Sequence, residues 1–251
     1  MRDAAGELHH FLAARHFAQG IGARGHALRQ AWTDLYERYR VEYPDLADHL
    51  ARTQRRQLPK HWDAHIPSFP PEEKGMATRD SSGRVLNAIA RQVPWLVGGS
   101  ADLAPSTKTL LTFDGAGSFG PDGQQGRNLH FGVREFAAAA VANGLSLAKL
   151  RPYWSTFLIF SDFARGAIRL SALMELPVVH IFTHDSIGVG EDGPTHQPVE
   201  QLASLRAIPG LLVIRPCDAN EVAEAWRLIM ELKHDPAVLV LSRGPMRTLD
   251  R

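Results

Sequence analysis

Residues 177–183 read PVVHIFT, a run of large apolar and β-branched side chains around a single histidine. A strand with one face in solvent alternates apolar and polar residues, and this run does not alternate. Continuous apolar runs are typical of parallel sheets, because helices cover both faces of such a sheet. The run therefore predicts a buried parallel strand.

Helix-like and strand-like segments alternate on both sides of this strand. The segments with helical periodicity are residues 82–92, 136–147, 157–173 and 220–232, and the short apolar runs are residues 95–97, 151–153, 211–215 and 237–242. Such alternation implies right-handed crossovers and a mostly parallel sheet. We therefore predict an α/β fold over residues 76–251, doubly wound, with helices on both faces.

Residues 1–75 differ in character, being rich in Arg, His, Gln and Pro. Leu28, Trp32, Leu35 and Tyr39 recur at helical spacing, which predicts a helix over residues 27–42 that stops before Pro44. Three later prolines, at positions 67, 70 and 71, indicate an irregular connector. We expect this region to be a helical segment and connector without a strand.

Composition narrows the function classes. The 251 residues include 28 basic and 27 acidic side chains, a formal net charge of +1 that gives no electrostatic reason to expect nucleic acid binding. One cysteine, Cys217, excludes an intrachain disulfide and a cysteine-rich metal site, and it is expected to be a packed thiol. The sequence contains no stretch of membrane-span length and no signal-peptide pattern, so a cytoplasmic protein is expected.

Three unusual segments follow predicted strands, where ligands gather in doubly wound sheets. They are residues 98–103 (GGSADL), residues 183–198 and residues 242–243. The second combines three glycines, two prolines, three acids and two histidines. It can be interpreted as a tight surface connection, as a zinc site of His184, Asp192 and His196, or as a polyol-binding loop. The spacing matches no helical histidine pair, which makes zinc the weaker interpretation.

Two further features have ordinary explanations when taken alone. Glu135 lies at the start of an Ala-rich predicted helix, where a carboxylate is usually a favourable partner of the helix dipole. Phe157, Phe160 and Phe163 recur every three residues, a stripe more often found in a core than at a cofactor. Composition and spacing alone lead to an α/β enzyme of unknown chemistry.

The quoted segments together resemble the transketolase family. The motifs GGSADLAPS, FGVREF, PYWSTFLIFSDFARGAIRL, THDSIGVGEDGPTHQPVEQ and LSRG occur in the family's order, over about residues 77–243. The resemblance implies the second of three domains, which binds the pyrimidine ring of thiamine diphosphate. It also implies that residues 1–75 are the connector from a diphosphate-binding first domain, and that the first and third domains are absent.

The resemblance assigns cofactor roles residue by residue. Glu135 matches the glutamate that hydrogen-bonds N1′ of the aminopyrimidine, which favours the imino tautomer whose N4′ takes the proton from the thiazolium C2. Phe157, Phe160 and Phe163 match the aromatic pocket around the pyrimidine; many relatives have tyrosine at the third position, so a polar contact is lost there. Asp102 matches an acid near the middle of the cofactor.

Substrate roles follow in the same way. Arg79, Ser106, His184 and Arg243 match the residues that hold the phosphate end of the sugar. Asp192 matches the residue that binds the C2 hydroxyl of the substrate. A further match, His196, is a histidine near the reacting carbons.

Absent motifs imply partners. The family's metal motif, a Gly-Asp pair followed after about thirty residues by Asn, belongs to the first domain and has no counterpart in this sequence. Magnesium and the diphosphate are therefore expected to be held by a partner domain, and a homo-oligomer is expected. The implied activity is two-carbon ketol transfer between ketose and aldose phosphates, in the pentose phosphate pathway. The alternatives are a non-catalytic, self-associating fragment, a 2-oxoacid dehydrogenase β chain, and deoxyxylulose-phosphate synthase.

Overall fold

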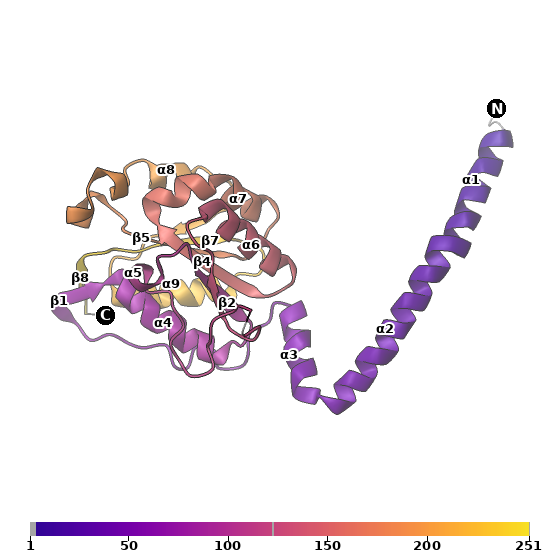
Figure 1. Cartoon of the computed structure of the whole chain (residues 1–251), viewed down its shortest axis with the longest axis horizontal. Helices are drawn as coiled ribbons and strands as arrows, with labels where there is room; N and C mark the ends of the chain where they lie inside the picture. Colours follow the sequence, from indigo (N-terminus) through magenta and orange to yellow (C-terminus); the bar gives the residue numbers. More distant parts are fainter. Residues whose placement is uncertain (1–3, 122, 251) are drawn as a thin grey trace. The chain divides into compact units, whose positions relative to one another are not determined.

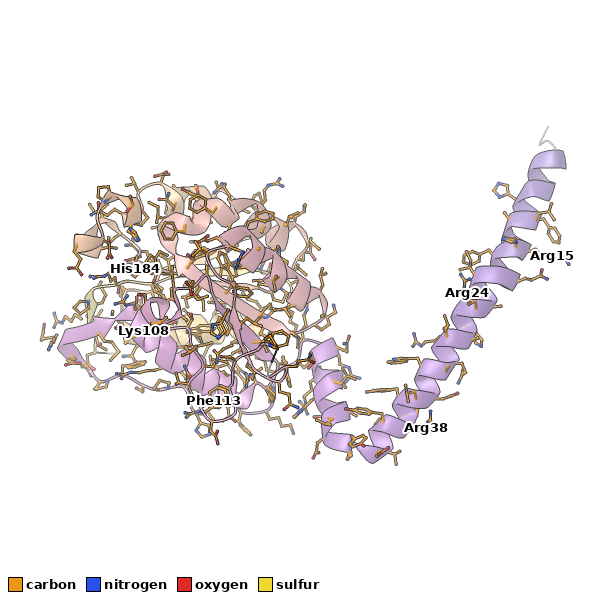
Figure 2. The ribbon with its side chains drawn as sticks, in the orientation of Figure 1. Arg15, Arg24, Arg38, Lys108, Phe113 and His184 are labelled. Carbon is orange, nitrogen blue, oxygen red and sulfur yellow. The ribbon has the colours of Figure 1, made fainter. Side chains whose placement is uncertain are left out.

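The computed structural model describes residues 4–121 and 123–250, and the chain divides into two compact units at Arg52 and Thr53. The first unit contains α1 (Ala4–Phe17), a π-helical turn (Ala18–Gly22) and α2 (Ala23–Glu42), and α3 (Pro44–Gln54) follows. Helical structure thus begins well before residue 27. Arg15, Arg24 and Arg38 project from these helices as exposed side chains (Figure 2). No helix in the described ranges is both long and apolar enough to cross a membrane.

The second unit is built on a six-stranded parallel sheet (Figure 1). Its spatial order is β3 (Asn128–His130), β2 (Leu96–Ser100), β4 (Arg151–Phe157), β5 (Val179–Thr183), β7 (Ala237–Val240) and β6 (Leu212–Ile214). Every pairing within this sheet is parallel. The predicted fold class is confirmed, and the PVVHIFT run forms the fully buried β5.

Helices cover both faces of this sheet, and successive strand residues face opposite layers. Tyr153 and Ile181 pack with α4 (Thr78–Gln92) and α9 (Ala219–Glu231) on one face. Trp154 and Phe182 pack on the other face with α6 (Glu135–Leu147), α7 (Ser161–Leu173) and α8 (Gln201–Arg206). This double burial explains why β4, β5 and β7 lack an alternating pattern.

One prediction for the connector is wrong, because a strand does occur before residue 76. β1 (Glu72–Ala77) pairs antiparallel with β8 (Pro245–Thr248) in a two-stranded ribbon. Gly75 has φ +58°, and a Cβ there would lie 1.7 Å from the carbonyl oxygen of Met246. The partner strand is remote in sequence, so local composition did not indicate this pairing. The expectation for Cys217 is also wrong, since its side chain is exposed.

Candidate functional site

The candidate residues gather at the carboxyl edge of the sheet. β2 is followed by Asp102 and by α5 (Ala104–Thr107), β4 ends at Phe157, and β5 is followed directly by His184. The chain order reverses here, since β3 and β4 lie on opposite sides of β2. Such a switch point leaves a crevice outside the strand ends where ligands bind in open α/β sheets.

Glu135 is the first residue of α6 and is 7% exposed. Its Oε1 accepts a hydrogen bond of 3.2 Å from Oγ1 of Thr156, the residue that precedes Phe157 in β4. A carboxylate that serves only the helix dipole has no need of burial, because such residues are well solvated in the first turn. Burial of Glu135 against the end of β4 therefore favours a role in a site.

The three phenylalanines form a ladder of rings that runs from a buried position to the surface. Phe157 and Phe160 have centroids 5.9 Å apart with planes 19° from parallel, and Phe160 and Phe163 follow at 6.1 Å and 29°. Phe157 is buried, but Phe163 is 65% exposed. The core interpretation holds for Phe157 and is wrong for Phe163, whose ring faces solvent where a flat partner can stack.

His184 joins this aromatic ladder to the charged part of the site. Its ring stacks on Phe157 at a centroid distance of 3.7 Å, and its Nδ1 lies 2.8 Å from Thr183 Oγ1. Burial, reinforced by the charge of Arg79, lowers the pKa of His184 to about 4, so the ring is neutral at pH 7. His184 has φ +60°, an uncommon conformation for a histidine that turns the chain sharply after β5.

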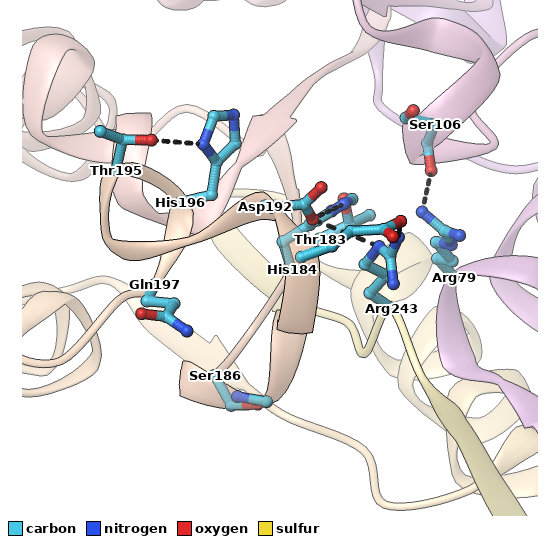
Figure 3. Close-up of polar contacts among 12 residues, drawn as sticks. Arg79, Ser106, Thr183, His184, Ser186, Asp192, Thr195, His196, Gln197 and Arg243 are labelled. Atoms are coloured by element: carbon cyan, nitrogen blue, oxygen red, sulfur yellow. Dashed lines mark hydrogen bonds and ion pairs between the residues drawn. The ribbon is translucent and has the colours of Figure 1, made fainter.

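Asp192 lies between His184 and Arg243 (Figure 3). Its Oδ2 is 3.6 Å from His184 Nε2 and 3.2 Å from Arg243 Nε. Neither contact has hydrogen-bond geometry, so within the described chain this buried oxygen has no hydrogen-bond partner. A buried carboxylate oxygen in that state is ready to accept a hydrogen bond from a hydroxyl group of a ligand.

Two arginines flank this acid. Arg243 Nη2 is 2.9 Å from Glu191 Oε1, and Arg79 Nη1 donates to the backbone oxygen of Ser106 at 3.0 Å. Burial, and then the charge of Arg243, lowers the pKa of Arg79, whose buried Nε has no hydrogen-bond partner among the described residues. Ser106 thus contacts Arg79 through its carbonyl group rather than through its hydroxyl.

Asp102 and His196 complete the set. Asp102 has φ +63° just beyond β2, and His196 Nδ1 lies 2.8 Å from Thr195 Oγ1. The ring of His196 contacts Phe157 and Phe160 at centroid distances of 5.7 and 5.4 Å. Among residues 4–121 and 123–250, no group of three His, Cys, Asp or Glu side chains is arranged to hold a metal ion.

Several contributors were not predicted from the sequence. Thr156 binds Glu135, Glu191 pairs with Arg243, and the hydroxyls of Thr78 and Ser242 bond to each other beside the two arginines. Thr78 and Ser242 each directly precede an arginine, and Ser242 also lies in the predicted strand-end segment 242–243; these were the sequence signals that pointed to them.

Comparison with known proteins gives a family for most of the chain. Residues 74–248 match the family described as transketolase, pyrimidine binding domain. The transketolase of Halalkalibacterium halodurans is 52% identical over 235 residues, which cover 93% of this chain and 35% of the relative. The transketolase of Bacillus subtilis is 50% identical over 239 residues, with coverages of 94% and 35%. The chain thus spans about a third of the length of these curated relatives.

Solved structures agree. A Pichia stipitis transketolase in complex with sedoheptulose 7-phosphate superposes with a TM-score of 0.85 at 42% identity, covering 90% of this chain and 34% of the other. A split-gene transketolase, described as an inactive beta4 tetramer, superposes with a TM-score of 0.57 at 31% identity, covering 70% of this chain and 55% of that chain.

Proposed function

Because the chain belongs to the transketolase family and carries its pyrimidine-binding domain, we propose that it supplies half of a thiamine diphosphate site for two-carbon ketol transfer between ketose and aldose phosphates. This half binds the pyrimidine ring and the sugar phosphate. We expect activity to require a partner domain that holds the diphosphate and magnesium, because this sequence has no counterpart of the family's Gly-Asp…Asn metal motif. Residues 1–75 act as the connector to that partner and residues 76–251 as the pyrimidine-binding domain.

The observation that carries this proposal is the buried carboxylate of Glu135, which is bound by Thr156 beside the end of β4, where the phenylalanine ladder begins. These residues fit an aminopyrimidine, since the rings offer flat apolar faces and the carboxylate can share a proton with ring atom N1′. When bound, thiamine diphosphate supplies the nucleophilic carbon. Glu135 holds the proton at N1′, Thr156 orients Glu135, and Phe157, Phe160 and Phe163 exclude water from the ring. Asp102 is assigned to the middle of the cofactor.

The charged residues suit a sugar phosphate. Arg79, Ser106, His184 and Arg243 are assigned to its phosphate end, where guanidinium groups donate charge-assisted hydrogen bonds to phosphate oxygens. Asp192 accepts from the C2 hydroxyl through its Oδ2, which has no hydrogen-bond partner among the described residues. A neutral His184 that accepts from Thr183 at Nδ1 presents its Nε2 proton to a substrate oxygen. The remaining histidine, His196, lies over the aromatic ladder near the reacting carbons.

The proposed partners follow from the family resemblance, because the chain spans about a third of the length of its curated relatives. A diphosphate-binding domain or subunit holds magnesium and completes the site, and the chain self-associates in the cytoplasm, where it serves the pentose phosphate pathway. A split-gene relative shows that a transketolase can be encoded in separate chains. Its description as an inactive tetramer also favours one second candidate, a self-associating chain that is not catalytic by itself.

The carboxylate supplies the test. The chain is mixed with a diphosphate-binding transketolase domain, magnesium and thiamine diphosphate, and hydrogen–deuterium exchange at C2 of the cofactor is measured. Glu135→Gln keeps the size of the side chain but cannot share a proton, so exchange should slow by about 10²-fold or more.

Glu221→Gln is the matched control, because Glu221 lies in the first turn of α9, away from the phenylalanine ladder. This variant should exchange at the parent rate. Equal rates for the Glu135→Gln variant and the parent would show that Glu135 is only a helix-end carboxylate, and the proposed function would then be rejected.

A further inference from the structure

Two buried hydroxyl groups connect the parts of the chain that carry the two arginines. Thr78 is the first residue of α4, and Ser242 follows β7. The backbone N–H of Thr78 donates to Ser242 Oγ at 3.0 Å, and the backbone N–H of Ser242 donates to Thr78 Oγ1 at 2.7 Å. The two hydroxyl oxygens are 3.1 Å apart. We call this reciprocal pair the hydroxyl clasp.

The clasp satisfies the free end of α4 from outside the helix. The first N–H groups of a helix have no partner within it, and Ala77 offers no side chain that can cap them. Ser242 supplies both acceptors, since its Oγ binds the N–H of Thr78 and its carbonyl binds the N–H of Arg79 at 3.4 Å. Ser242 Oγ also donates to the carbonyl of Gly244 at 2.8 Å, which fixes the turn after β7.

Both arginines are directly adjacent to the clasp in the chain, because Arg79 follows Thr78 and Arg243 follows Ser242. Each guanidinium is then fixed at its far end, by the Ser106 carbonyl for Arg79 and by Glu191 for Arg243. The ribbon of β1 and β8 joins the same two chain segments a second time, because Ala77, next to Thr78, pairs with Pro245. Two like charges are therefore held near one another by backbone bonds, despite their mutual repulsion.

We propose that Thr78 and Ser242 are positioning residues, whose paired hydroxyls set the spacing of Arg79 and Arg243 so that one phosphate group contacts both. This inference rests on the proposed function, in which these arginines hold the phosphate end of the substrate. Neither hydroxyl contacts the phosphate, and their effect is transmitted through the adjacent backbone.

The test uses inorganic phosphate and the full chain without cofactor. Binding is followed by NMR through the side-chain Nε–H signals of the arginines. Thr78→Val keeps the shape of the side chain but removes the hydroxyl, and Ser242→Ala removes the other; each should weaken phosphate binding about tenfold or more, because misplaced charged groups lose their shared ligand. Thr78→Ser restores a hydroxyl and should restore affinity. Should the valine variant fail to fold, the smaller Ser242→Ala change decides the matter.

Ser171→Ala is the matched control. Its buried hydroxyl bonds to Asn143 at 2.6 Å between α6 and α7, so its loss tests general loosening of the fold. Parent-like affinity in the Thr78→Val and Ser242→Ala variants, or an equal loss in Ser171→Ala, overturns the clasp proposal. Arg79→Gln and Arg243→Gln test the phosphate end that the proposed function assigns, separately from the clasp. If these variants bind phosphate like the parent, or if the parent does not bind it, the assigned phosphate end is wrong. The clasp proposal would then be wrong as well.

Discussion

Asp192 shows at the level of one residue how the site prepares for a ligand. Its Oδ2 is buried near two cationic or proton-bearing groups and yet lacks a hydrogen bond in the described chain. A hydroxyl group of the substrate would supply the hydrogen bond that this oxygen lacks, beside its ion pair with Arg243.

A first prediction concerns this oxygen. In the complex with a diphosphate-binding partner, Asp192→Ala should leave exchange at C2 of the cofactor unchanged, because that exchange depends on Glu135. Discrimination between donor sugars that differ at the C2 hydroxyl should fall by about 10-fold to 100-fold in kcat/KM. Asp185→Ala is the control, since Asp185 lies in the same loop as Asp192 but pairs with Arg215 after β6. Unchanged discrimination in Asp192→Ala contradicts the assigned role.

A second prediction concerns pH. His180 is fully buried in β5, accepts a hydrogen bond from the indole of Trp154, and has its pKa lowered by burial to about 3. The pKa of His184 is lowered to about 4. In the unfolded chain both histidines titrate near 6.5, so between about pH 6.5 and pH 3 the unfolded state binds more protons. The free energy of unfolding should therefore fall as the pH falls through this window, by up to about 1.4 kcal/mol per pH unit for each histidine.

Urea denaturation at a series of pH values measures this slope. His180→Asn keeps an acceptor for Trp154 but does not titrate, so its slope should be shallower than that of the parent. Identical slopes for the two proteins would mean that His180 does not control acid stability.

Among the elements, the buried strands and helices were predictable from the sequence, and the pairing of β1 with β8 in the two-stranded ribbon was not. β5 and β7 consist of continuous apolar residues, and α9 has regular helical periodicity, so their positions followed from pattern alone. β1 begins with the polar residues Glu72, Glu73 and Lys74 followed by a glycine, a composition that disfavours strands. It is a strand because β8 supplies its hydrogen bonds, and that partner cannot be seen in a local window.

The candidate site divides in a similar way. His184, Asp192 and Arg243 lie in the strand-end segments that stand out in the sequence, whereas Arg79 was assigned only through the family resemblance. The roles of Thr78 and Ser242 were not predicted, because hydroxyl residues are common at helix starts and in turns for purely structural reasons. Their reciprocal bonds depend on a distance in space that no spacing in the sequence reveals.

A third prediction belongs to the ribbon of β1 and β8. Gly75→Ala forces a side chain into a positive-φ position and against the Met246 carbonyl, so it should lower the free energy of unfolding by about 1–3 kcal/mol. Gly144→Ala is the control, since Gly144 lies inside α6 with open space around it. This variant should have a free energy of unfolding about 0.5–1 kcal/mol higher than that of the parent. Urea midpoints measure both, and a neutral Gly75→Ala would show that the ribbon contributes little.

For the second unit as a whole, the outer side of α6 and α7 is unusually apolar. The exposed side chains there are those of Phe136, Leu147, Phe163, Leu170 and Leu173. Contiguous exposed apolar residues mark protein interfaces more often than free surface. We predict that another chain or domain covers this face.

The fourth prediction follows from that face. At micromolar concentration the chain should sediment as a dimer or higher oligomer in analytical ultracentrifugation. Leu173→Glu should shift it toward monomer, whereas Leu228→Glu should not, because Leu228 is an exposed leucine on α9. A parent chain that stays monomeric over this range, or a Leu173→Glu variant that associates as tightly as the parent, would show that this face is not the one that self-associates.

The hydroxyl clasp also has a consequence for biosynthesis. Thr78 and Ser242 are 164 positions apart, and a ribosome releases the chain from its N-terminus. Glu135 and the phenylalanine ladder therefore emerge, with β4 and β5 to support them, well before Ser242 is made. The first turn of α4, which carries Arg79, lacks its cap until Ser242 is made, whereas Ser106, which binds the Arg79 guanidinium, is made early. A nascent chain arrested before residue 242 would hold the groups assigned to the pyrimidine, together with Arg79, but it would lack both the cap of α4 and Arg243. The two arginines could therefore reach their proposed spacing only after residue 243 is made.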